Sequence, residues 1–356
     1  MTERKYLPIG LFLGLVVCFQ LAASLSGRSY YLTQLTMSAY YSLVVVGLCL
    51  LMGYAGQISL GHAGFFAIGG YTSALLTTMD LTPHADSLPV RLLVKASFLV
   101  QRPTLSGREA LSFSPWVAFG IALCVTAAVA FVIGIPVIRL KGHYLAMATL
   151  GFGVIVYKIL LGTRALGEAD GISSVPGFTL LPGLEVTGRP PARIANYYIA
   201  WLVVAGAMLL SINLIHSRIG RALRSIHGNE EAANMLGVNT SRYKLYTFVL
   251  SALFASVGGI LLTHYNASIG PTETSVMKSV RYVAIVAAGG MDNLWGTLLM
   301  GTVLNYLSLR GTFGTLDDAF FGAILILVML FAPRGLLRAA WLKGLLSRKA
   351  RDGRAA

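Results

Sequence analysis

Long apolar stretches recur along this chain, and they restrict its fold more than any single motif does. Leu7 to Leu25 and Tyr31 to Met52 each approach the roughly 20 residues that cross a hydrocarbon core as a helix. With 56% hydrophobic and 12% charged residues, a water-soluble domain of this length would expose too much apolar surface. The sequence therefore predicts an all-α polytopic membrane protein with a single transmembrane domain over residues 1–356.

About ten segments are expected to cross the membrane, separated by two long mixed loops at 80–114 and 163–194. The first segment has a cleaved signal peptide as its alternative, and whether 56–79 and 275–290 cross fully or re-enter is left open. The ten expected segments are 7–25, 31–52, 56–79, 115–138, 144–162, 195–217, 244–264, 275–290, 294–309 and 319–332.

The distribution of basic residues predicts an orientation. With a cytoplasmic N-terminus, the inside loops and the basic tail at 333–356 hold 15 Lys and Arg, whereas the outside loops hold 9. Because cytoplasmic loops favour Lys and Arg, both termini are expected in the cytoplasm. The net charge of +14 therefore fits a membrane protein next to anionic lipid and does not predict binding to nucleic acid.

A polar island at 218–243 interrupts the apolar pattern. Its first half is predicted to be a basic amphipathic helix with Ile219, Leu223 and Ile226 on the apolar face and Arg218, Arg221 and Arg224 on the polar face. After Gly228, a second short helix is predicted over Glu230, Glu231, Ala232 and Ala233, with Asn229 as its N-cap and Gly237 ending it in the left-handed conformation. This island is interpreted as a cytoplasmic coupling loop for a partner protein, and an ordinary solvated loop is the alternative.

Small and polar residues mark the segment 56–79. Gly56, Ser59, Ala63, Ala67, Gly70 and Ala74 follow at steps of three or four, which predicts one small helical face. Polar groups are costly in lipid unless they face a cavity or a partner. A solute path is therefore predicted along Gly56, Gln57, Ser59, Gly61, His62 and Gly64, with plain helix packing and a satisfied interhelical histidine as the alternatives.

A second glycine-marked segment lies near the C-terminal end. The glycines at 289, 290, 296 and 301 echo those at 56, 61, 64 and 69, and each set flanks a polar break. Interrupted segments in two halves are typical of an internal repeat around a midplane pathway. The predicted path is therefore extended to Gly289, Gly290, Asn293 and Gly296.

The chain carries no energy source of its own that the sequence reveals. The dipeptide Gly-Lys is absent, so there is no phosphate-binding loop of the G-x-x-x-x-G-K-[ST] kind. All fourteen carboxylates are expected in loops or at segment ends, which disfavours an ion-coupled secondary transporter without excluding it. The three cysteines are interpreted as small buried hydrophobes, and no metal site, resident cofactor or hydrolytic constellation is predicted, so the chain is not expected to be an enzyme.

Three blocks in order resemble the LivM branch of the branched-chain amino-acid ABC permeases. They are GYAGQISLGHAGFFAIGGYTSALL at 53–76, GRALRSIHGNEEAANMLGVNTSRYKL at 220–245 and AAGGMDNLWGTLLMG at 287–301. Within the second block, Glu231-Ala232-Ala233 followed by Gly237 is similar to the EAA-x-x-x-G signature of ABC importer permeases. The similarity covers residues from about 30 to 335.

The resemblance implies a fold similar to that of type II importers and a permease that imports branched-chain or related hydrophobic amino acids. It also implies a heterodimer with a LivH-like permease, two cytoplasmic ATPase subunits that bind ATP-Mg, and a periplasmic solute-binding protein. In this family the Asn229–Gly237 helix would seat on the ATPase. Importers of urea and short-chain amides share this branch, so the solute is left open.

Overall fold

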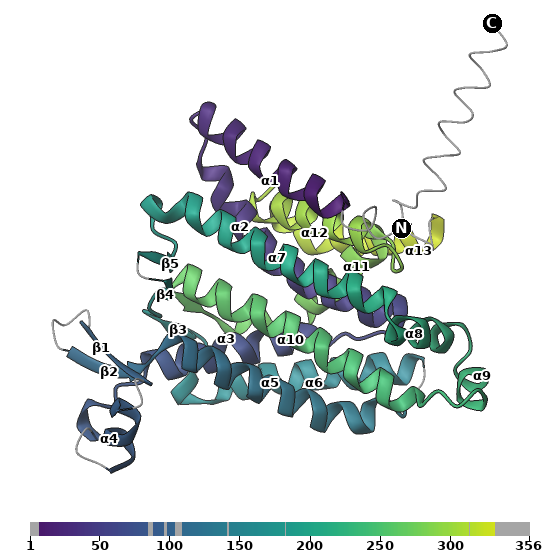
Figure 1. Cartoon of the computed structure of the whole chain (residues 1–356), viewed down its shortest axis with the longest axis horizontal. Helices are drawn as coiled ribbons and strands as arrows, with labels where there is room; N and C mark the ends of the chain where they lie inside the picture. The colour runs from purple at the N-terminus through teal and green to yellow at the C-terminus, as the bar shows by residue number, and fades with distance from the viewer. Residues whose placement is uncertain are drawn as a thin grey trace, which may run out of the picture.

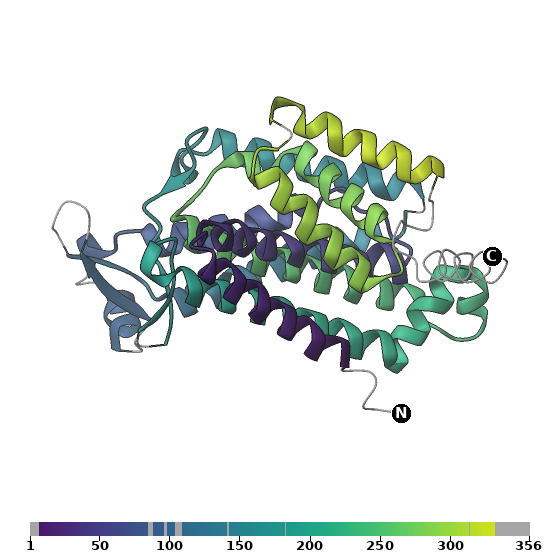
Figure 2. The same cartoon turned by 90° about the horizontal axis from the view of Figure 1, so that it is seen from above.

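The computed structural model describes residues 7–331 apart from 85–87, 96–97, 104–108, 141, 182 and 313. The basic tail at 333–356 and the first six residues lie outside the described residues. Helices dominate the fold, and their axes follow the long dimension of the molecule in both views (Figures 1 and 2). The helices are α1 Leu7–Leu25, α2 Tyr30–Cys49, α3 His62–Thr78, α4 Leu88–Lys95, α5 Pro115–Val137, α6 His143–Gly162, α7 Arg193–His216, α8 Arg218–Gly228, α9 Glu230–Met235, α10 Thr240–Asn266, α11 Val276–Gly289, α12 Leu294–Leu309 and α13 Asp317–Phe331.

Six helices of the described chain are long and apolar enough to cross a membrane. They are α1, α2 with its extension to Tyr54, α5, α6, α7 with the turn before it, and α10. The other apolar helices, α3, α11, α12 and α13, have 14 to 17 residues. The multi-pass architecture expected from the sequence is confirmed at this level, and ten crossings remain a prediction.

The predicted helix at 56–79 begins later than expected. A π-helical turn, Leu50–Tyr54, ends α2, and the chain then runs without helix to α3 at His62. Gly56 has φ +67°, a left-handed conformation that a helix interior does not use. The prediction that Gly56 and Ser59 belong to a small helical face is therefore wrong, because both residues precede the helix.

The remaining part of the small face belongs to α3, which packs mainly against α10 and α5. Ala63, Ala67, Gly70 and Ala74 are buried. The backbones of α3 and α10 approach so closely that a side chain would not fit between them. A Cβ on Gly259 of α10 would lie 1.9 Å from the Phe66 carbonyl oxygen. The helix-packing alternative for these small residues is thus supported by the contacts of α3.

Short strands lie at one end of the molecule. The predicted loop at 80–114 contains α4 and an antiparallel hairpin, β1 Leu99–Pro103 with β2 Glu109–Phe113. The loop at 163–194 contributes β3 Ile172–Ser173, which pairs with β6 Ser268–Ile269, and the pair β4 Phe178–Leu181 with β5 Leu184–Val186. Figure 1 shows these elements at the end opposite to α8 and α9.

The loop at 80–114 is anchored at its first turn by Asp80. Thr82 donates both its hydroxyl and its backbone N–H to Asp80 Oδ1, at 2.5 and 2.9 Å. These hydrogen bonds stabilise the ionised carboxyl and lower the pKa of Asp80. The turn is thus fixed as soon as the chain leaves α3.

The helix α11 is shorter than the roughly 20 residues that cross a hydrocarbon core. Its 14 residues correspond to about 21 Å. The 3₁₀ turn before it, Pro271–Thr274, places Glu273 within 3.1 Å of the Tyr41 hydroxyl, and Tyr41 lies near the middle of the helical run from Tyr30 to Tyr54. The break at 267–275 therefore lies level with the middle of α2, whereas the glycine-marked break at 289–296 lies at the α8 end.

The cysteine interpretation needs one correction. All three cysteines are free, and Cys49 is buried as expected, but Cys18 and Cys124 are exposed on the outer faces of α1 and α5. Both helices present apolar side chains outward, which is the arrangement that lipid requires. No group of three or more metal-ligating side chains occurs within the described ranges.

Candidate functional site

The short helix α9 stands at one tip of the molecule with the capping chemistry that its sequence predicts. Asn229 Oδ1 accepts a hydrogen bond from the Ala232 N–H at 3.0 Å, so Asn229 is the N-cap. Gly237 has φ +82°, and the Val238 N–H bonds back to the Ala233 carbonyl at 3.1 Å. The predicted start and end of this helix are confirmed.

One face of the α8–α9 unit packs against the membrane domain. Ala233 is buried with Leu223 and Ile226 of α8 and with Ala55, which follows the π-turn. The expected apolar face of α8 is confirmed for Leu223 and Ile226, but Ile219 is 44% exposed. Ala233 is therefore a packing residue and is not available to a partner protein.

Charged residues tie the unit to the long helices. Lys244 of α10 forms an ion pair with Glu230 at 2.5 Å, and the two side chains are 8% and 26% exposed. Arg224 donates to the Ile215 carbonyl at 3.1 Å, which fixes α8 to the last turn of α7. Glu231, Ala232 and Arg221 are exposed. Lys244 was not predicted as part of the site, since nothing in its local pattern indicates a partner fourteen residues earlier.

The exposed side of α9 carries two large apolar side chains that the sequence reading overlooked. Met235 and Leu236 are 89% and 82% exposed. Adjacent apolar residues at a protruding tip are typical of a contact surface. The sequence signal for them is two adjacent apolar residues just before the helix-ending Gly237, which the pattern of charged and capping residues does not include.

The α8 helix contacts the break at the end of α2. A Cβ on Gly56 would lie 3.0 Å from His227 Nδ1 in the last turn of α8. The same break contacts the turn between α11 and α12: the Tyr54 hydroxyl donates to the Asp292 carbonyl at 3.0 Å, and Cys49 Sγ approaches the Met291 carbonyl at 3.2 Å. A continuous chain of contacts thus links α9, through α8, to two separate breaks in the membrane domain.

The predicted path residues divide into two groups. Gly56 lies against α8, whereas Gly61 and Gly64 pack against α6, where Cβ atoms would meet Thr149 and Phe152. Gly289 and Gly296 pack on each other across the α11–α12 turn, Gly290 has φ +98° in that turn, and Asn293 caps α12 through the Gly296 N–H. These glycines let backbones approach closely, so their places in the structure are explained by packing.

The polar residues of the predicted path are buried. His62 has a partner at each ring nitrogen, Ser59 Oγ at 2.9 Å and Ser251 Oγ of α10 at 2.6 Å, as the interhelical-histidine alternative requires. Gln57 is 2% exposed, and its side-chain oxygen and nitrogen have no hydrogen-bond partner among the described residues. Gln57 is therefore the polar path residue whose hydrogen-bonding capacity is left open.

A charged cluster lies beside α2, and the sequence does not predict a carboxylate next to this helix. Glu273 pairs with Lys278 at 2.7 Å, and Asp317 pairs with Arg281 at 2.7 Å. Glu273 lies in the turn before α11, at a segment end as expected, but this turn brings its carboxylate within 3.1 Å of the Tyr41 hydroxyl of α2. Each carboxylate has a cationic partner, so the charges of this cluster neutralise one another in pairs.

Comparisons with known proteins agree with this architecture. A family model described as the branched-chain amino acid transport system / permease component matches residues 30–329. The high-affinity branched-chain amino acid transport system permease protein LivM of Salmonella typhimurium is 31% identical over 323 residues, which cover 85% of this chain and 68% of that protein.

More distant relatives share the similarity over nearly their full length. BraD of Pseudomonas aeruginosa is 26% identical over 326 residues, which cover 86% of this chain and 96% of that protein. LivH of Escherichia coli is 27% identical over 320 residues, with coverage of 86% and 96%. No solved structure matches. This chain belongs to the family of permease components of branched-chain amino acid transport systems.

Proposed function

We propose that this chain is the transmembrane permease subunit of an ABC importer that carries branched-chain amino acids into the cytoplasm. The observation that carries the proposal is α9, a capped helix at the tip of the molecule with Met235 and Leu236 exposed. A protruding helix of this kind gives a separate ATPase a surface through which its motion can be transmitted. Family membership and the names of the relatives support the solute class.

The proposed assembly contains four kinds of subunit besides lipid. A LivH-like permease completes the transmembrane part, and two ATPase subunits bind ATP-Mg and seat on α9 with Glu231 and Arg221 at the contact. A periplasmic solute-binding protein docks at the opposite end, where α4 and β1–β2 protrude (Figure 1). This places both termini in the cytoplasm of an inner membrane protein with about ten crossings and a type II importer-like fold.

The proposed mechanism follows the chain of contacts from α9. Closure of the ATPases displaces α9, and α8 moves with it because the two helices share a buried cluster with Ala55. Tyr54 then shifts against Asp292, so that the turn between α11 and α12 moves relative to α2. The cavity between this subunit and its partner thereby opens to one side and then the other.

Reconstitution tests the proposal directly. Proteoliposomes that contain this permease, its LivH-like partner and the ATPases should import L-leucine from loaded binding protein only when ATP is inside the compartment that faces α9. Urea and acetamide serve as competing solutes, and an ion gradient without the ATPases serves as the control for secondary transport. Leucine uptake driven by the ion gradient without the ATPases would contradict the assignment as an ABC importer.

The Glu230–Lys244 ion pair is expected to transmit force between α9 and α10. Lys244→Met leaves a partly buried carboxylate without its partner, which we expect to cost about 1 kcal/mol because Glu230 keeps some solvent screening. We expect leucine uptake per ATP hydrolysed to fall about 5-fold. The double charge swap Glu230→Lys with Lys244→Glu should restore most of the coupling, and equal coupling in the single and swapped variants would argue against this role.

A further inference from the structure

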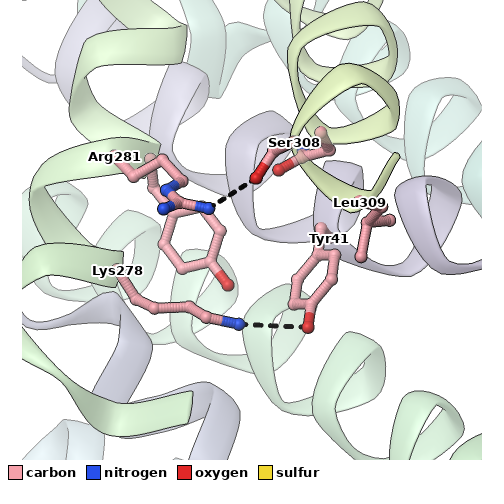
Figure 3. Close-up of a pocket in the computed structure, with 7 residues that line it drawn as sticks. Tyr41, Lys278, Arg281, Ser308 and Leu309 are labelled. Carbon is pink, nitrogen blue, oxygen red and sulfur yellow. Dashed lines mark hydrogen bonds between the residues drawn. The ribbon is translucent and has the colours of Figure 1, made fainter. Parts of the chain in front are cut away.

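A small pocket opens beside the middle of α2, at the level where α11 begins. Figure 3 shows Lys278 and Arg281 of α11 directed toward Tyr41 of α2 and Ser308 of α12. It is lined by Tyr41, Lys278, Arg281, Tyr282, Asn305, Ser308 and Leu309. Tyr41 lies 11 residues after the start of α2, or about 16 Å along its axis, so the pocket is near the middle of the helical run from Tyr30 to Tyr54.

Most charges around the pocket are already paired. Lys278 Nζ donates to the Tyr41 hydroxyl at 3.1 Å and to Glu273 at 2.7 Å. Arg281 donates to Ser308 Oγ at 2.8 Å and pairs with Asp317 and Asp318. The side chains of Lys278 and Arg281 are 23% and 16% exposed, so both cations still reach the pocket. The paired charges hold the walls of the pocket in place.

The hydrogen-bonding groups that are left over are mainly donors. The Tyr282 hydroxyl is buried in a residue that is 1% exposed, and it has no partner among the described residues; Arg281 Nε has none either. Lys278 carries three N–H donors, of which two are used. Buried donors without partners cost free energy, so this set favours a ligand that brings acceptor oxygens.

The position of these donors on α11 selects an anion over a neutral carbonyl. The donors belong to the first two turns of α11, whose N-terminus is capped by Ser275 through the Lys278 N–H, and the helix dipole favours negative charge there. Asp317 Oδ1 also has no partner among the described residues, but Asp317 does not line the pocket. A carboxylate thus fits the unused donors of the pocket.

We propose that this pocket is a transient binding site for the α-carboxylate of the amino acid during its passage through the membrane domain. The proposal rests on the proposed function and adds the recognition chemistry: Tyr282, Arg281 and Lys278 donate to the carboxylate, and Leu309 supplies apolar contact. Such a site selects amino acids over urea and amides, because neutral solutes lack the charge that the donors match.

Saturation-transfer difference NMR on the complete transporter in nanodiscs, without the binding protein, measures weak solute binding. L-Leucine should bind wild type, isovalerate should displace it because it keeps the carboxylate, and isoamylamine, which lacks the carboxylate, should displace it far less. In Tyr282→Phe the leucine Kd should rise about tenfold, since a hydrogen bond to a charged group is lost.

Tyr40→Phe is the matched control. Tyr40 is also fully buried with an unpartnered hydroxyl, but it does not line the pocket, so its leucine Kd should be unchanged. Leucine binding that isoamylamine displaces and isovalerate does not, or equal affinity in wild type and Tyr282→Phe, overturns the proposal. If leucine is imported but shows no binding to wild type, the pocket assignment fails alone; if leucine is never imported, the proposed function fails first.

Discussion

Two carboxylates at the tip of α9 are expected to abolish import while the chain stays folded in the membrane. In the variant Met235→Asp with Leu236→Asp, both replaced side chains are more than four-fifths exposed, so almost no packing within the chain is lost. Burial of each apolar side chain against a partner contributes about 1.5 to 3 kcal/mol, and a buried carboxylate opposes it. Affinity for the ATPases should therefore fall at least about 100-fold.

Co-purification of the ATPases with the permease measures this loss, together with leucine uptake in proteoliposomes. Ser241→Asp is the charge control, because Ser241 is an exposed residue in the first turn of α10, where a carboxylate is favoured by the helix dipole. The control should bind the ATPases as wild type does. Normal ATPase binding by the double variant would show that the tip of α9 is not the docking surface.

The local structure of α9 was predictable because helix caps are short-range chemistry. An asparagine that precedes two glutamates and a glycine seven residues after Glu230 determine where the helix starts and ends, whatever the rest of the fold does. What the cap cannot predict is which face packs inward. Ala233 lies in the same signature as Glu231, yet it is buried against Ala55, which is far away in the sequence.

The boundary of α3 was mispredicted for a long-range reason. Residues 56–61 have the apolar and small composition of a helix, and nothing local forbids one there. The π-turn at Leu50–Tyr54 and the contact of Gly56 with His227 of α8 place the start of α3 six residues later than the pattern indicates. Hydrophobic periodicity does not report such contacts.

The local sequence also does not reveal which charges pair around the pocket lined by Lys278 and Arg281. Lys278 and Arg281 are visible in the sequence as cations one turn apart in a short apolar segment. Their partners come from other parts of the chain: the hydroxyl of Tyr41 is 237 residues from Lys278, and Asp317 begins α13. The depth of Glu273 depends on a turn that descends into the bundle, which hydropathy assigns to a loop.

The second large effect is expected at Gly53, where the two breaks of the membrane domain touch. In Gly53→Ala the added Cβ would lie 1.7 Å from the Met291 carbonyl oxygen and 2.5 Å from its carbon. Both groups are backbone, so the segments themselves must separate, at a cost of about 3 kcal/mol or more. The hydrogen bond from Tyr54 to Asp292 would be strained at the same time.

This separation removes the step that passes motion from α8 to the turn between α11 and α12, while the docking face of α9 is untouched. We expect Gly53→Ala complexes to hydrolyse ATP but to import leucine at least about tenfold more slowly. Gly206→Ala in α7 is the matched control, since a Cβ there meets nothing within 4 Å and should be neutral or slightly stabilising. Tyr54→Phe is the milder variant in case Gly53→Ala does not fold, and it should lower uptake per ATP about threefold. Full coupling in Tyr54→Phe together with full import in Gly53→Ala would mean that force reaches the solute path by another route.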